Sequence, residues 1–157
     1  MVEPNTLLIN IERDWDQFKI WFDGVDFSLK LLYRGSEQEF SNANFQRLVG
    51  NQQPTLHIIK SEHDHIFGGC AFEKYPTGDG VNKRDDKAFL FQTHPNQVRL
   101  KKRLDSKNQN SAIRTWNDSL SMFGSGTDLR IYEKNSSKSY TAGLGNKTFE
   151  KPAGCNS

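Results

Sequence analysis

The chain has 157 residues, of which 34% are hydrophobic and 25% are charged, a length and composition typical of one globular domain. Its 21 basic and 19 acidic residues give a formal net charge of +2, which is too small to indicate a nucleic-acid-binding protein. No apolar run approaches the about 20 residues of a membrane-spanning helix, and the first residues lack the apolar core of a secretory signal. We therefore expect a single domain over residues 1–157, cytoplasmic and not inserted in a membrane.

The first part of the chain predicts two short helices. Trp15, Phe18 and Phe22 recur three or four residues apart, which is the spacing of one helix face. They lie in a helical lead-in over about residues 7–24, and we expect their face to cover one end of the fold. Ser41 is a suitable N-cap for a second helix.

Alternating apolar and polar residues predict strands along the rest of the chain. The expected strands lie at 27–33, 55–60, 65–72, 87–93, 97–104, 112–116, 127–133 and 139–143. A loop is expected at 75–86, which contains proline and two glycines. The predicted fold class is α+β, mainly β: a two-sheet antiparallel sandwich with a few short flanking helices. The residues expected to face inward are Phe27, Leu29, Leu31, Ile58, Phe67, Phe89, Phe91, Leu129 and Ile131.

One run of residues has the composition of a metal site. Glu62–His65 lies in the turn between two expected strands, and His63 and His65 would project to the same side of a strand. A third ligand would have to come from His57 or His94, and nothing in the sequence places either one. A charged hairpin tip in solvent is the simpler interpretation, so we expect no metal and no cofactor.

Motifs for nucleotide binding or covalent catalysis are incomplete. Residues 143–148 resemble a phosphate loop, but Asn146 stands where the glycine before lysine is required. Ser125 lies between glycines without completing G-x-S-x-G. Cys70 lies in an apolar strand and is expected to be buried, and with Cys155 it is too little for a disulfide framework. The residues alone therefore predict no catalytic site.

Several short motifs nevertheless occur in a recognisable order. They are Tyr33-Arg34-Gly35-Ser36 with Phe40-Ser41, Pro54-Thr55-Leu56, Phe67-Gly68-Gly69, Ala88-Phe89-Leu90-Phe91 and Phe123-Gly124-Ser125-Gly126-Thr127-Asp128-Leu129. In this order they resemble the TLDc domain family, over roughly residues 7–154. The resemblance assigns structural roles to thirteen residues, called the motif residues below: Arg34, Gly35, Phe40, Pro54, Phe67, Gly68, Gly69, Phe89, Phe91, Phe123, Gly124, Gly126 and Asp128.

The chain departs from the family pattern at several of these places, and Cys70 stands where an aromatic residue usually follows Phe-Gly-Gly. Thr127 stands where the family has histidine, and Ser125 replaces a glycine. Glu39 stands at the glycine of the family's "RDGF" turn.

Domains of this family normally continue through further strands beyond the position that corresponds to Ser157. We therefore expect a truncated C-terminal end, either because this sequence lacks the last strands or because the domain is a shortened member of the family. A shortened domain would leave an open sheet edge beside residues 112–116 or 127–133, which a partner would cover.

The resemblance implies a non-catalytic protein-interaction module. Such a module would bind or regulate the vacuolar proton-pumping ATPase and contribute to protection against oxidative damage, peripheral to the organelle membrane through its protein partner. The alternative is a structural accessory subunit of another large assembly, whose neighbour covers the open edge. An enzyme that uses Glu62–His65 or Cys70 ranks behind both.

Overall fold

The computed structural model describes residues 11–94, 96, 98–102, 109–125, 128–134, 140–142 and 148–150. Its helices are α1 (Ile11–Trp21), α2 (Asn42–Val49) and a 3-10 turn, η1 (Gln109–Ser111). The strands are β1 (Thr55–Lys60), β2 (Ile66–Ala71), β3 (Asn82–Lys83), β4 (Phe89–His94), β5 (Val98–Lys102), β6 (Ile113–Arg114), β7 (Ser119–Phe123), β8 (Leu129–Tyr132), β9 (Tyr140–Ala142) and β10 (Phe149–Glu150). None of the helices in this part of the chain has the length and apolar character needed to cross a bilayer.

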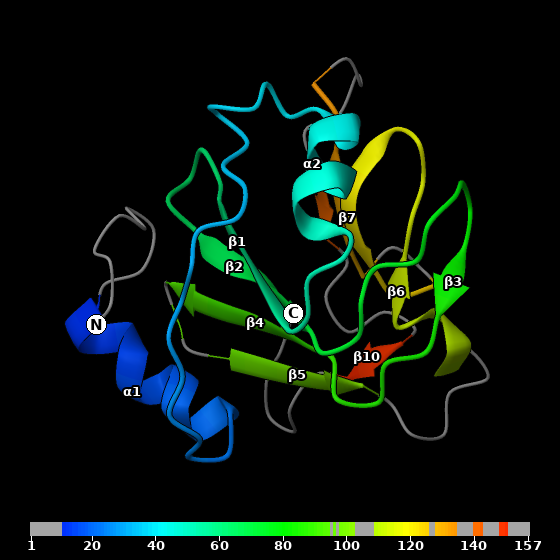
Figure 1. Ribbon diagram of the computed structural model, residues 1–157. Coiled ribbons are helices and arrows are strands. Elements are labelled where there is room, and N and C mark those ends of the chain that lie inside the picture. The colour runs from blue at the N-terminus through cyan, green and yellow to red at the C-terminus, as the bar shows by residue number, and fades with distance from the viewer. Residues whose placement is uncertain are drawn as a thin grey trace.

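The strands form two antiparallel sheets that pack against each other (Figure 1). Sheet A has the strand order β1-β2-β4-β5-β10, and sheet B has the order β3-β6-β7-β8-β9. The hairpin predicted from residues 55–60 and 65–72 is present as β1 and β2, paired from Thr55 opposite Ala71 to Lys60 opposite Ile66. The predicted fold class, a mainly β sandwich with short helices, is confirmed.

Buried side chains from both sheets fill the space between them. This inner cluster contains Phe67, Ala71, Tyr75, Ala88, Leu90, Ala112, Ile113, Phe123, Leu129 and Phe149, with Ile131 packed against it. The predictions that Phe67, Leu129 and Ile131 face inward are confirmed.

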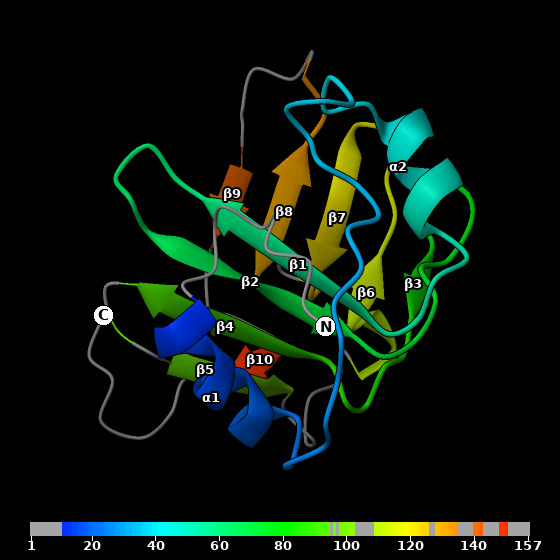
Figure 2. The ribbon, with the colours of Figure 1, turned by 60° about the vertical axis from the view of Figure 1, so that its left-hand side comes forward.

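Sheet A is also covered on its outer face, where α1 crosses in front of β4 and β5 (Figure 2). Phe18 of α1 meets Phe91 of β4 with their ring centroids 5.2 Å apart, and Trp21 meets Phe89 at 6.2 Å. The helix therefore covers a sheet face, and the prediction that it covers one end of the fold is wrong.

The prediction that Phe89, Phe91 and Ile58 point toward the other sheet is also wrong, although both phenylalanines are buried. Side chains alternate along a strand, so Leu90 takes the inner face and its two neighbours take the outer one. Ile58 of β1 packs on the same outer face. Both faces of this sheet are apolar, and alternation alone cannot say which of them meets sheet B.

Residues 25–34 form no strand, contrary to the prediction for 27–33. Phe27 and Leu29 instead pack against the outer-face cluster of α1 and sheet A, with the Phe27 ring 4.4 Å from that of Trp15. Leu31, predicted to face inward, is 49% exposed. The alternation reflects a surface segment that turns some of its side chains toward α1, without pairing to a sheet.

Two strands of sheet B, β3 and β7, were not predicted from the sequence. Every residue of β7 is buried, yet two of its five residues are serines, so no apolar pattern marked it. Strand β3 lies within residues 75–86, which were predicted to be a loop. β6 lies between β3 and β7, and β8 lies between β7 and β9. The prediction of an open edge beside residues 112–116 or 127–133 is therefore wrong.

Helix α2 begins where its cap predicts. Ser41 has extended backbone angles, and its hydroxyl accepts a hydrogen bond from the Asn44 N–H at 3.4 Å. Phe45 of α2 packs against Leu120 of β7 in one cluster, and its ring centroid lies 5.8 Å from that of His57 on β1. The helix thus contacts both sheets.

Candidate functional site

The two glycines of the Phe67-Gly68-Gly69 motif lie against aromatic rings on opposite faces of sheet A. A Cβ on Gly68 would lie 2.8 Å from Cζ of Phe91, on the outer face. A Cβ on Gly69 would lie 2.6 Å from Cζ of Phe123, on the inner face. A glycine pair in a strand allows this close approach from both sides. The motif therefore lets β2 lie close to Phe91 of the Ala88-Phe89-Leu90-Phe91 motif and to Phe123, the first residue of the Phe123–Leu129 motif.

Two further motif glycines have similar partners. Gly124 has a φ of +79°, and a Cβ there would lie 2.7 Å from Cγ of Asp128. The Asp128 side chain is buried and accepts a hydrogen bond from the Thr148 N–H at 3.2 Å. A Cβ on Gly35 would lie 2.6 Å from Cδ1 of Phe40. These residues therefore lie in turns and at close contacts.

The remaining motif residues do not gather at one cavity. Arg34 forms an ion pair with Glu37 at 3.3 Å in the turn before α2. Pro54 follows a cis peptide bond just before β1. Gly126 and Thr127 lie outside the described residues. Among the motif residues that are described, each supports its own stretch of the fold.

A buried carboxylate joins the end of β2 to the start of β4. One Asp85 oxygen accepts hydrogen bonds from the N–H groups of Phe72 and Glu73, at 2.6 and 2.9 Å. The other accepts from Lys87 and Ala88, at 3.1 and 3.0 Å. Four backbone donors account for both oxygens, so this carboxylate holds the chain in place. An open depression of about 470 Å³ lies beside it.

His57, considered above as a metal ligand, points into the core from β1. Its ring lies 5.2 Å from that of Tyr75 and 5.5 Å from that of Phe123, and Nε2 is 3.1 Å from the Thr55 hydroxyl. Burial lowers the pKa of His57 to about 4, because the charged imidazolium loses its hydration there. The side chain is therefore neutral in the folded protein near pH 7.

The lowered pKa of His57 predicts a loss of stability in mild acid. As the pH falls from about 6.5 to about 4, the unfolded chain takes up a proton that the folded chain excludes, so the free energy of unfolding drops by about 3 kcal/mol. Urea unfolding at pH 7 and pH 4.5 measures the loss. His57→Gln, which stays neutral, should flatten this dependence, whereas His63→Gln at the exposed hairpin tip should leave it unchanged. Equal slopes for wild type and His57→Gln would contradict the assignment.

The run Glu62–His65 lies exposed at the tip of the β1–β2 hairpin, as expected. Asp64 forms an ion pair with Lys60 at 2.8 Å, and His57 is directed into the core, away from the tip. Within the described ranges, no three His, Cys, Asp or Glu side chains are placed to hold a metal ion. The absence of a metal in the protein remains a prediction.

Two of the other residues considered for chemistry lie among the described residues. Cys70 is buried in the outer-face cluster. The Ser125 N–H donates to the Thr148 hydroxyl at 3.0 Å. Residues 143–147 of the phosphate-loop candidate, and Cys155, lie outside the described residues.

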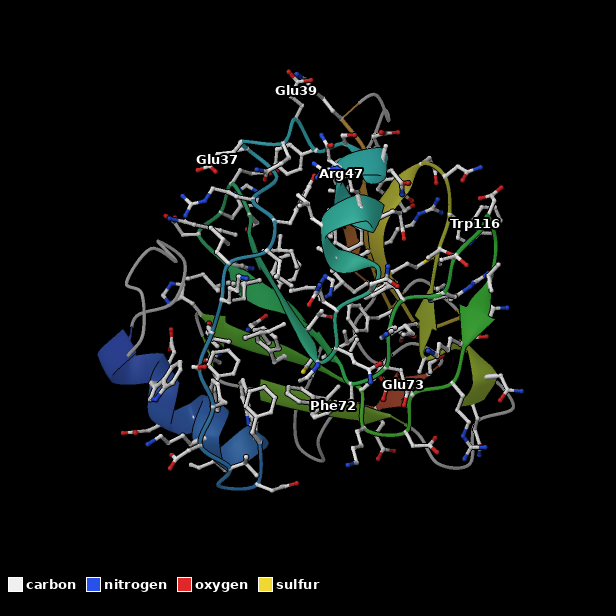
Figure 3. All side chains as sticks on the ribbon, in the orientation of Figure 1. Glu37, Glu39, Arg47, Phe72, Glu73 and Trp116 are labelled. Atoms are coloured by element: carbon white, nitrogen blue, oxygen red, sulfur yellow. The ribbon has the colours of Figure 1, made fainter. Side chains whose placement is uncertain are left out.

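An arginine–aromatic cluster lies on the outer face of sheet B, and sequence analysis did not find it. Arg114 of β6 and Arg130 of β8 lie 5.7 and 5.6 Å from the ring centroid of Trp116. Arg130 also lies 4.5 Å from the Tyr132 ring and forms an ion pair with Asp118. Trp116 is 38% exposed at the periphery of the molecule (Figure 3). This cluster combines cationic and aromatic groups in one surface patch.

The sequence also matches a known protein family. A sequence model of the TLDc domain matches residues 16–154. The chain belongs to the TLDc domain family. The match spans all thirteen motif residues, so the resemblance drawn from them is confirmed. No curated protein matched the chain.

One departure from the TLDc pattern has a measurable consequence. Glu39 occupies the glycine position of the family's turn with a φ of +55°, a conformation that is unfavourable for any residue with a Cβ. Glu39→Gly should therefore raise the free energy of unfolding by about 0.5–1 kcal/mol, after the extra freedom of glycine in the unfolded chain is counted. Denaturant unfolding measures the gain. Glu39→Ala is the matched control, and an equal gain from alanine would assign the effect to the lost charge.

Proposed function

We propose that this TLDc domain is a non-catalytic interaction module that binds and regulates the vacuolar proton-pumping ATPase, in the cytoplasm, and contributes in this way to protection against oxidative damage. Membership of the TLDc family is the observation that carries the proposal.

The roles of Asp85 and of the motif residues Arg34 and Asp128 support a binding function. The buried carboxylates of Asp85 and Asp128 accept backbone hydrogen bonds, and Arg34 is paired with Glu37. These groups hold the fold together. An interaction module needs a rigid scaffold and a distinctive surface, and the sandwich supplies both.

Affinity purification of the full chain, followed by mass spectrometry, tests the proposal. We expect subunits of the vacuolar ATPase to be enriched over a tag-only control, at less than one chain per pump and dissociable. A stoichiometric, inseparable association with another assembly would instead favour a structural accessory subunit. Failure to enrich any ATPase subunit would overturn the proposed partner.

The non-catalytic part of the proposal has a separate test. Cys70→Ser and the double change of His63 and His65 to Ala alter the side chains that an enzyme would use. Each variant should still bind the pump and protect cells against peroxide as the wild-type chain does. Loss of protection in a variant that folds and binds normally would indicate catalysis.

A further inference from the structure

The two arginines of the outer-face cluster are brought together by strand register. Arg114 of β6 lies opposite Met122 of β7, which in turn lies opposite Arg130 of β8. Residues in one cross-strand row point to the same face of a sheet. The neighbours Ile113 and Leu129 belong to the inner cluster, so both arginines point away from the core.

The hydrogen bonds of the cluster leave one arginine less compensated than the other. Arg130 donates to the Ser119 hydroxyl at 2.7 Å and is paired with Asp118. Arg114 donates from one terminal nitrogen to the Ser125 carbonyl at 3.2 Å. Its buried Nε has no hydrogen-bond partner among the described residues. Among the described residues the Asp118 carboxylate pairs with Arg130, and no ion pair is seen for Arg114, so the two guanidinium groups together carry an excess positive charge.

Electrostatics agrees with this view of Arg114. Burial and the nearby charge of Arg130 both lower its pKa from the ordinary value, because each disfavours the charged form. An incoming carboxylate would offset both effects, since it supplies the opposite charge and hydrogen-bond acceptors. The exposed Trp116 ring beside it offers an apolar surface for a neighbouring side chain.

We propose that this cluster of Arg114, Trp116, Arg130 and Tyr132 binds an acidic peptide segment of a protein partner, with a carboxylate on Arg114 and an apolar side chain on Trp116. Tryptophan, tyrosine and arginine are the residues that most often dominate the energy of protein interfaces. A planar guanidinium matches a carboxylate in two parallel hydrogen bonds. The inference rests on the proposed interaction function for the presence of a protein partner, but not on the identity of that partner.

A labelled peptide with a central phenylalanine flanked by glutamates tests the surface directly, with a glutamine version as its control. Fluorescence anisotropy should show binding of the glutamate peptide that weakens with salt. Arg114→Gln and Trp116→Ala should each weaken it roughly tenfold. Arg114→Lys keeps the charge but loses the planar fork, so it should lie between wild type and Arg114→Gln.

Arg47→Gln is the matched charge control, because Arg47 is exposed on α2 (Figure 3). It should bind the peptide as the wild type does, and thermal unfolding should show that all variants fold. The inference is overturned if the glutamate peptide does not bind, if the glutamine peptide binds equally, or if Arg47→Gln weakens binding as much as Arg114→Gln. A stronger response to single-stranded nucleic acid than to the peptide would also overturn it.

The two proposals fail separately. Peptide binding at this cluster without enrichment of ATPase subunits would leave the surface assigned and the proposed partner wrong. If Arg114→Gln and Trp116→Ala still enrich the pump, the proposed partner is correct and its contact lies elsewhere on the domain.

Discussion

Phe89→Ala should lower the free energy of unfolding by about 3–5 kcal/mol, since it empties a fully packed position. The Phe89 side chain is 1% exposed, and its ring contacts those of Trp21, Phe22 and Phe72 at centroid distances of 5.8–6.4 Å. Denaturant unfolding measures the loss. Ile20→Ala, at a position 66% exposed on α1, is the control and should change stability by less than about 0.5 kcal/mol.

A double-mutant cycle shows which face of sheet A the ring occupies. Contacting residues have non-additive effects, whereas distant ones add. Phe89→Leu combined with Trp21→Phe should therefore be non-additive, because these rings touch on the outer face. Phe89→Leu combined with Ile113→Val, in the inner cluster, should be additive. The reverse pattern would place Phe89 between the sheets and would refute the outer-face cluster.

The sequence was sufficient for elements whose signal is local. The apolar-rich runs at 55–60 and 65–72, on either side of a polar turn, predicted the β1–β2 hairpin, and the Ser41 cap predicted the start of α2. The sequence could not show which face of a strand meets the other sheet. In β4 the residues Phe89, Leu90 and Phe91 are all buried, because α1 covers one side and sheet B the other. A continuous apolar run contains no information about which residue meets which layer.

The parts that sequence analysis missed depend on long-range contacts. Ser119 and Ser121 interrupt the apolar pattern of β7, so the sequence did not predict this strand. A buried serine hydroxyl needs hydrogen-bond partners from elsewhere in the fold. Ser119, for example, accepts a hydrogen bond from Arg130. The candidate surface was missed for the same reason. Arg114 and Arg130 are sixteen positions apart, and only their register across β7 brings them to one face. The motif glycines were found through the family resemblance, but their partners became visible only in the fold.

Gly68→Ala should lower the free energy of unfolding by at least about 3 kcal/mol. The new Cβ would overlap the backbone carbonyl oxygen of His57 on the paired strand β1, and it would lie 2.8 Å from Cζ of Phe91. Neither neighbour can yield, because the carbonyl belongs to a sheet strand and the ring is fully buried against Phe18. Overpacking of a well-packed position typically costs about 1–3 kcal/mol when side chains can adjust, so a backbone clash should exceed that range.

Gly24→Ala separates this clash from the general effect of replacing a glycine. Gly24 has a φ of +75° but no atom within 4 Å of the position that a Cβ would take. Its replacement should therefore cost only the backbone strain, about 1–2 kcal/mol. If the two variants unfold at the same denaturant concentration, the close approach of β1 and Phe91 to Gly68 is not what the motif requires. A larger loss at Gly68 than at Gly24 would show that the glycine is required for the close approach of β1 and Phe91. Phe91→Leu should restore little of the stability, because the His57 carbonyl oxygen of β1 stays in place.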